Sequence, residues 1–168
     1  QIPNWVNEKT LVVACSYSGN TEETLSSFSA CIDRTHNIFV VSTGGKLVEL
    51  AKRKKIPCLI LPSGFQPRAA IGYSITFNLL LLNKLNLIPN SLVEEIFKGI
   101  EDLENFSMTL SSTPNSAYLL ASELSGYMPI IYGSSNFGDI IGLRFANQLS
   151  ENSKILSFSN SIPEQNHN

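Results

Sequence analysis

The chain has 168 residues, of which 43% are hydrophobic and 15% are charged, and its formal net charge is −2. This length suits one domain, or one domain and part of another. The apolar content allows a sizeable core, so we do not expect a disordered chain. Proteins that neutralise nucleic-acid phosphates are normally basic, which argues against a nucleic-acid partner. No apolar run reaches the roughly 18 residues of a membrane span, so we expect no membrane partner.

The three cysteines, Cys15, Cys31 and Cys58, form an odd set without the spacing of a metal site. Cys15 and Cys58 sit in apolar runs, where cysteine is usually a small core residue. This usage fits a reducing, cytoplasmic environment. Because the chain has only two histidines and no cluster of candidate ligands, we expect no metal.

The first half of the chain alternates strands with helices. Short apolar, β-branched runs predict buried strands over residues 10–15, 37–42 and 57–61. Turn residues and charged first or last turns predict helices over residues 22–34 and 46–55. Two prolines and a glycine predict a loop over 62–67, and a long apolar helix is expected over 68–85. Apolar strands that alternate with helices predict an α/β fold, a parallel sheet flanked by helices.

The second half begins with a different pattern. Acidic residues interleaved with apolar ones predict amphipathic helices over 91–126, broken near 111–115. The alternation then resumes, and we expect a strand over 128–132, a loop over 133–136, a helix over 138–149 and a strand over 154–158. We therefore interpret the chain as a first domain over 1–90, a helical connector over 91–127 and the beginning of a second domain over 128–168.

The segment that points to chemistry is Ser16-Tyr-Ser-Gly-Asn-Thr21, between a predicted strand and a predicted helix. Ligands bind at the carboxyl ends of strands in open parallel sheets, and helix N-termini attract anions. The hydroxyls of Ser16, Ser18 and Thr21 could converge there on a phosphate. Neither a Walker loop nor a dinucleotide-binding glycine fingerprint is present. The alternative is that these side chains only cap the following helix.

Several segments together resemble one known family. SYSGNTEETL (16–25) resembles the phosphosugar-binding signature of sugar isomerase (SIS) domains. Four further segments resemble the bifunctional phosphoglucose/phosphomannose isomerase branch, namely TGGKL (43–47), GFQPRAAIGY (64–73), NQLSENSK (147–154) and PEQNHN (163–168). These matches cover most of the chain in order, whereas residues 91–126 match only in general character.

The resemblance implies a flavodoxin-like SIS domain followed by the start of a second one. It implies that Ser16, Ser18 and Thr21 bind the 6-phosphate of a hexose 6-phosphate substrate, and that Arg68 lies near the sugar's C1 and C2 oxygens. The implied reaction interconverts glucose 6-phosphate, and mannose 6-phosphate as a further substrate, with fructose 6-phosphate. This route needs no cofactor.

The resemblance also implies the groups that move protons. Glu151 matches the catalytic base, and His167 matches the histidine of ring opening, which reaches the site from the other subunit of a homodimer. Without this context, Arg68 could simply start a helix, Glu151 could lie in solvent beyond a helix, and His167 could be an exposed terminal residue. Tyr17 either packs or contacts the sugar. The Ser134–Ser135 loop we interpret as a structural turn.

Family members also have a preceding strand with a GMGGS turn, and they continue beyond the NHN segment. The chain thus resembles an internal segment, and we expect weak or no activity from these residues alone. One alternative is a phosphosugar-binding regulatory module without catalysis, which would need the loop at 16–21 but not Arg68, Glu151 or His167. Another is an aminosugar-phosphate deaminase or synthase domain, which the NHN tail disfavours.

Overall fold

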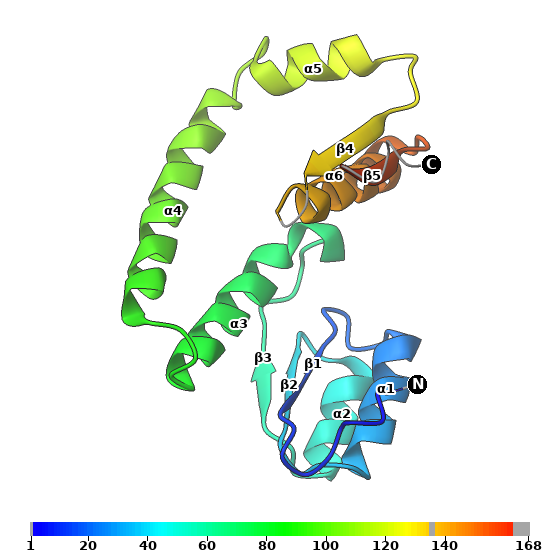
Figure 1. Ribbon diagram of the computed structural model, residues 1–168, viewed down its shortest axis with the longest axis vertical. Helices are drawn as coiled ribbons and strands as arrows, with labels where there is room; N and C mark the ends of the chain where they lie inside the picture. Colours follow the sequence, from blue (N-terminus) through cyan, green and yellow to red (C-terminus); the bar gives the residue numbers. More distant parts are fainter. Residues whose placement is uncertain (1, 135–136, 163–168) are drawn as a thin grey trace. The chain divides into compact units, whose positions relative to one another are not determined.

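The structure is a computed structural model that describes residues 2–134 and 137–162 (Figure 1). It divides into two compact units, residues 1–96 and residues 97–168. In the part of the chain that the structure describes, no helix is both long enough and apolar enough to cross a membrane.

The first unit is built on three parallel strands in the order β1-β2-β3. Its elements are β1 (Val12–Cys15), α1 (Glu22–Ile32), β2 (Ile38–Ser42), α2 (Gly45–Arg53), β3 (Cys58–Ile60), the short 3-10 helix η1 (Pro67–Ala69), α3 (Ile71–Lys84) and the beginning of α4 (Asn90–Thr109). Val13 pairs with Phe39, and Val40 pairs with Cys58. The predicted strands and the parallel α/β fold are therefore confirmed.

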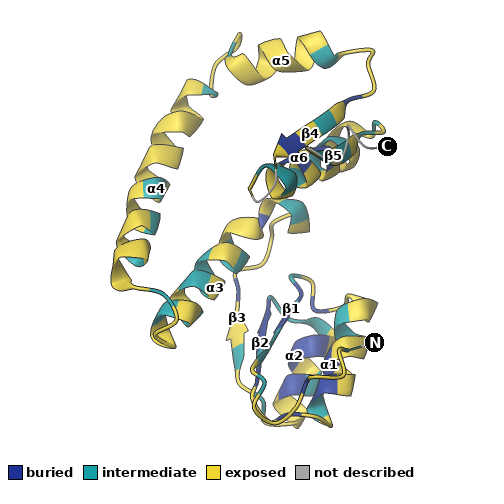
Figure 2. Ribbon diagram, in the orientation of Figure 1, coloured by how far each residue is buried: buried dark blue, intermediate teal, exposed yellow. Residues whose placement is uncertain are grey.

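The two faces of β2 show how helices cover this sheet. Alternate residues of a strand point to opposite faces. Ile38 and Val40 are buried in a core that includes Phe28 of α1 and Leu47 of α2 (Figure 2). On the other face, Phe39 stacks on Phe77 of α3, with ring centroids 5.4 Å apart. Coverage on both faces explains the continuous apolar run of β2. β3 was also predicted to be buried, but as an edge strand it leaves Leu59 and Ile60 exposed.

The segment around Arg68 differs from the prediction. A helix was expected to begin at Arg68, but this residue lies in η1, and α3 begins only at Ile71. Pro67 occupies the first position of η1, where its missing N–H costs nothing. The backbone N–H groups of Ala69 and Ala70 donate to carbonyls three residues back, at 2.8 and 3.1 Å. Arg68 is thus held in a tight turn of its own.

The second unit contains the rest of α4, then α5 (Ser116–Leu124), β4 (Ile130–Ser134), α6 (Phe137–Ser153) and β5 (Phe158–Ile162). β4 and β5 are parallel and adjacent, with Ile130 opposite Phe158. The amphipathic helices were predicted, and the break between them is confirmed. Asn115 begins α5, because its side-chain oxygen accepts a hydrogen bond from the N–H of Tyr118 at 2.9 Å.

The end of the second unit corrects two predictions. The helix expected to end near Leu149 continues to Ser153, and the strand expected over 154–158 begins only at Phe158. Lys154 has a left-handed φ of 57°, which stops α6, and the Ser157 hydroxyl then donates to the carbonyl of Ala146 at 2.7 Å. The β4 strand also runs further than expected, to Ser134. The apolar residues Ile155 and Leu156 had suggested a strand where the chain is in fact turning back along α6.

Candidate functional site

The hydroxyl loop, residues 16–21, joins β1 to α1 at the carboxyl edge of the first sheet. Ser16 is buried, and its N–H donates to the carbonyl of Val41 at 3.1 Å, so it extends the β1–β2 pairing by one residue. The Ser16 Oγ and Thr21 Oγ1 atoms lie 2.9 Å apart. The Ser16 Oγ also accepts from the N–H of Gly19, and the Ser18 Oγ accepts from the N–H of Asn20. The three predicted phosphate ligands therefore belong to one compact turn.

The position of Thr21 bears on the capping alternative. Thr21 occupies the N-cap position of α1, yet among the described residues its side chain makes no capping hydrogen bond. Its hydroxyl pairs with Ser16 instead, so the capping interpretation is wrong for this residue. The first N–H groups of α1 have no intrahelical acceptor, as at every helix start. Two adjacent hydroxyls and a helix N-terminus together suit an anion of phosphate size.

The junction of β2 and α2, residues 42–45, is bonded to the hydroxyl loop. The N–H and the hydroxyl of Thr43 both donate to the carbonyl of Tyr17, at 3.0 and 2.7 Å. The N–H of Leu47 donates to the carbonyl of Gly19 at 2.9 Å. The loops after two neighbouring strands are therefore bonded to each other, so each fixes the other's shape.

This contact requires glycine on both sides. Gly19 has φ +67°, and a Cβ added there would overlap the carbonyl oxygen of Gly44. Gly45 has φ +69°, and a Cβ there would lie 2.6 Å from the carbonyl oxygen of Ser18. Other residues rarely adopt this left-handed conformation. The glycine positions of the two motifs thus follow from the close approach of their backbones.

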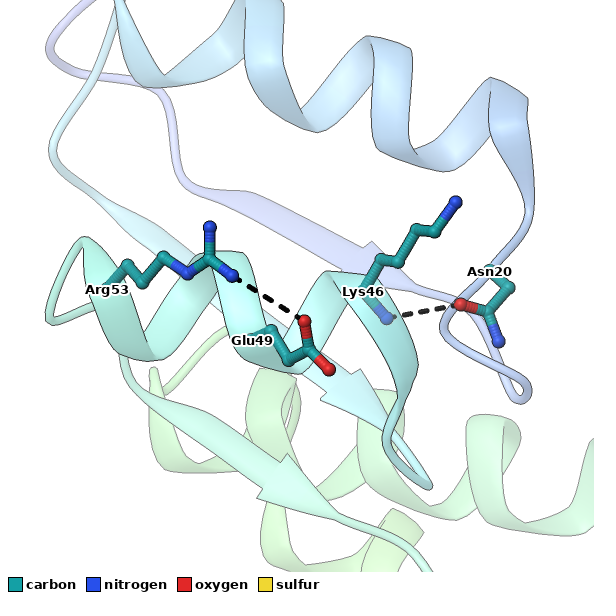
Figure 3. A network of polar contacts seen from close by, with 4 residues as sticks. All are labelled: Asn20, Lys46, Glu49 and Arg53. Atoms are coloured by element: carbon teal, nitrogen blue, oxygen red, sulfur yellow. Dashed lines mark hydrogen bonds and ion pairs between the residues drawn. The ribbon is translucent and has the colours of Figure 1, made fainter.

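Asn20 connects the hydroxyl loop to α2 (Figure 3). Its side-chain oxygen accepts from the N–H of Lys46 at 3.1 Å, and its side-chain amide donates to the carbonyl of Ser18 at 3.2 Å. Gly44, at the N-cap position of α2, has no side chain to cap with, so Asn20 performs this task from the neighbouring loop. Further along α2, Glu49 and Arg53 form an exposed ion pair at 3.7 Å, an arrangement that contributes little to stability.

Arg68 lies in the same unit, after the segment that follows β3. This segment is bonded to Tyr17, whose hydroxyl donates to the carbonyl of Pro62 at 2.9 Å and accepts from the N–H of Phe65 at 3.1 Å. Arg68 itself is half-buried. The sequence left open whether Tyr17 packs or contacts a sugar, and the structure shows its hydroxyl bonded to the chain just before Arg68.

The other predicted catalytic residues do not belong to this unit. Glu151 lies in the last turn of α6 and is exposed, so it is inside a helix rather than beyond one. The ammonium of Lys154 donates to the Glu151 carbonyl at 2.6 Å. His167 falls outside the described residues, as does Ser135. The structure thus brings together Ser16, Ser18 and Thr21, with Arg68 in the same unit, and places Glu151 in the second unit.

The first unit also contains a partly buried cysteine and an apolar cavity. Cys15 directly precedes Ser16, and burial raises the pKa of its thiol, which keeps it protonated and unsuited to act as a nucleophile. A cavity of about 460 Å³ lies between β3, η1 and α3, but its walls are mainly apolar side chains such as Leu59, Leu61 and Phe77. Such walls offer a phosphate almost no hydrogen bonds, so the hydroxyl loop remains the better candidate for an anion.

Sequence reasoning missed the roles of Thr43 and Asn20. Their position in the chain could have indicated these roles. Thr43 directly follows β2, the strand next to β1, and Asn20 lies in the loop after β1. Loops at the carboxyl ends of neighbouring parallel strands meet at one edge of the sheet. That rule predicts proximity, but it does not predict which atoms bond.

Comparison with known proteins identifies the relatives of this chain. Residues 113–168 match the family model of the bacterial phospho-glucose isomerase C-terminal SIS domain. The whole chain is 42% identical, over 170 residues, to a bifunctional phosphoglucose/phosphomannose isomerase of Caldicellulosiruptor bescii, a match that covers 99% of this chain and 50% of that protein. Along almost its whole length the chain is similar to the bifunctional phosphoglucose/phosphomannose isomerase family. A member from Thermoplasma volcanium is 34% identical, over 99% of this chain and 51% of its own length.

A relative with a different activity is also similar. A D-glucosamine-6-phosphate 4-epimerase of Sulfolobus acidocaldarius is 38% identical, over 97% of this chain and 51% of that protein. The chain spans about half the length of the curated relatives that it matches. The matches run through both units, so the hydroxyl loop and the Glu151 segment both lie within the matched stretch.

Replacement of Gly19 by alanine should disrupt the hydroxyl loop. The new Cβ meets the Gly44 carbonyl, and a left-handed alanine alone costs about 1–2 kcal/mol, so we expect a loss of about 2 kcal/mol or more in unfolding free energy. The affinity of the variant for inorganic phosphate should also be lower than that of the wild-type protein. Urea unfolding and phosphate titration measure the two effects.

Gly72→Ala is the matched control. Gly72 lies in α3, and among the described residues nothing would lie within 4 Å of its added Cβ. Alanine favours the helix, so this variant should keep both stability and phosphate binding. Wild-type phosphate affinity in Gly19→Ala would contradict the assignment of the loop.

Proposed function

We propose that the protein is an aldose–ketose isomerase that interconverts glucose 6-phosphate and mannose 6-phosphate with fructose 6-phosphate. The observation that carries this proposal is the hydroxyl loop at the N-terminus of α1, within a chain similar to this family. The named activities of the relatives support the same reaction class. We further propose the division into a first SIS domain over 1–90, a connector over 91–127 and the start of a second SIS domain over 128–168.

The first step is the capture of the phosphate. Ser16, Ser18 and Thr21 donate hydrogen bonds to its oxygens, and the first turn of α1 adds N–H groups and the positive end of the helix dipole. The phosphate lies far from the reacting carbons. Its binding energy is therefore available to orient the sugar.

The second step opens the ring and moves a hydrogen. His167 accepts the proton of the C1 hydroxyl and donates one to the ring oxygen, which breaks the ring C–O bond and leaves an open-chain aldose. The Glu151 carboxylate then takes the proton from C2, and an enediolate forms across C1 and C2. Glu151 returns that proton to C1, and the proton of the C2 hydroxyl passes to the C1 oxygen, so that C2 becomes the carbonyl of the ketose. No electrons leave the sugar, so no redox partner is required.

Arg68 stabilises the intermediate in this scheme. The enediolate has negative charge on its oxygens, and a fixed guanidinium lowers the energy of that charge as it develops. The tight turn of η1, which limits the movement of the Arg68 backbone, supports this role.

We also propose that the protein is a homodimer in which His167 serves the site of the neighbouring subunit. The resemblance of residues 163–168 to the family's histidine segment supports this arrangement. A symmetric dimer would then contain two sites, each built from both chains.

The epimerase relative favours a second candidate, 4-epimerisation of an aminosugar phosphate. A third possibility is a regulatory module that binds a phosphosugar without converting it. The hydroxyl loop supports all three, because each needs a phosphate site.

The deciding experiment uses the protein expressed from its complete coding sequence. It is incubated separately with glucose 6-phosphate, mannose 6-phosphate and glucosamine 6-phosphate, and the products are identified by NMR. We expect fructose 6-phosphate from the first two. Conversion of glucosamine 6-phosphate alone would favour the epimerase, and saturable binding of all three without product would favour the regulatory module.

The Glu151→Gln variant tests the base. Glutamine is nearly isosteric but cannot accept the C2 proton, so we expect isomerase activity to fall at least about a hundredfold. Inhibition by inorganic phosphate should be nearly unchanged, because the hydroxyl loop is intact. Glu123→Gln, in the exposed helix α5, is the control and should keep full activity. Near-normal turnover by Glu151→Gln would reject this residue as the base.

The shared site makes a prediction of its own. Glu151→Gln and His167→Ala subunits should each be nearly inactive alone. When they are refolded together, half of the dimers are mixed and each has one intact site, so about one quarter of wild-type activity should return. Mass spectrometry of the mixture verifies that mixed dimers form. If they form and stay inactive, the histidine is not exchanged between subunits.

A further inference from the structure

We propose that Tyr17 is a positioning residue, which holds the segment carrying Arg68 against the hydroxyl loop. This inference rests on the proposed function, because it is the sugar substrate that gives Arg68 its task. Tyr17 lies between Ser16 and Ser18, but its hydroxyl bonds outside that loop. It donates to the carbonyl of Pro62 at 2.9 Å and accepts from the N–H of Phe65 at 3.1 Å.

The main chain of Tyr17 is fixed as firmly as its hydroxyl. Its carbonyl accepts from the N–H and the hydroxyl of Thr43, at 3.0 and 2.7 Å. A single residue, Tyr17, is therefore bonded both to the loop that follows β2 and to the segment that follows β3. Hydrogen bonds of one residue thus connect the chain at the ends of three neighbouring strands.

The segment that Tyr17 holds lies outside regular strands and α-helices, and Phe65 within it also packs edge-on against the Tyr73 ring. Residues 62–66 are exposed and have no regular secondary structure, and η1 begins at Pro67. Gly64 within this stretch has φ +103°. Such a stretch would otherwise sample many conformations. Beyond it, the short-range hydrogen bonds of η1 and the burial of Ala70 make the backbone stiff. The bond at Phe65 and the buried Ala70 thus bracket Arg68 from both sides.

The bonding of the hydroxyl also separates positioning from catalysis. Its proton is engaged with Pro62 and one of its lone pairs with Phe65. Its partners are neither Ser16 nor Thr21, which bond to each other. Loss of the hydroxyl should therefore leave phosphate capture intact and misplace the guanidinium at the other end of the sugar.

The test is Tyr17→Phe in the protein expressed from its complete coding sequence. Phenylalanine keeps the ring and removes both hydrogen bonds. We expect kcat for glucose 6-phosphate to fall about tenfold or more, with KM and inhibition by inorganic phosphate within about twofold of wild type. In hydrogen–deuterium exchange, the Phe65 amide should exchange faster, because it has lost its acceptor.

Tyr73→Phe is the matched control. The Tyr73 ring meets Phe65 edge-on, with centroids 5.9 Å apart, and within the described residues its hydroxyl makes no hydrogen bond. This variant makes the same chemical change beside the same segment and should alter neither kcat nor exchange at Phe65.

Three results would overturn the proposal. Unchanged exchange at Phe65 in Tyr17→Phe would show that the hydroxyl does not hold the segment. Faster exchange with unchanged kcat would show that the connection does not serve the reaction, and an equal loss in Tyr73→Phe would remove the special role of Tyr17. Absence of turnover by the wild-type protein would instead reject the proposed function, and the exchange measurement would still decide whether the connection exists.

Discussion

The candidate site depends on the bonding between two loops at the carboxyl ends of neighbouring strands. The Tyr17 carbonyl takes two hydrogen bonds from Thr43, and the Gly19 carbonyl takes one from Leu47. These bonds satisfy backbone groups that would otherwise lack partners at the end of the sheet. They also bring the backbones so close that only glycine fits at positions 19 and 45. The shape of the hydroxyl loop is therefore a property of the sheet edge, not of the six-residue motif alone.

A close approach of a strand and a helix through glycine also occurs in the second unit. A Cβ on Gly133 of β4 would overlap the backbone of Gly138 in α6, so this strand and its helix also meet through glycine. Glu151 lies at the opposite end of α6, in its last turn. The rule that ligands gather at the carboxyl ends of strands leads to the hydroxyl loop, but it does not lead to this glutamate. Only the resemblance of residues 147–154 to the family singles Glu151 out.

Local pattern predicted most of the elements, because strand and helix signals are strong where both faces of a sheet are buried. The failures came where tertiary contacts decided the outcome. Ile155 and Leu156 had the composition of a strand, but a left-handed Lys154 and the bond from Ser157 to α6 direct the chain otherwise. Arg68 was expected in a long helix, yet Pro67 and the bonds of η1 give it a separate turn. The hydroxyls of the candidate site could be predicted from the sequence, whereas the side chains that connect them to the rest of the sheet could not.

The hydroxyl of Tyr17 has a consequence for how the site forms as the chain is synthesised. Its partners at Pro62 and Phe65 lie 45 and 48 residues further along the chain. The motif at 16–21 leaves the ribosome before these partners, so the Tyr17 hydroxyl lacks them until the segment after β3 has been added. The candidate site is thus completed only after the residues that first draw attention to it have already been synthesised.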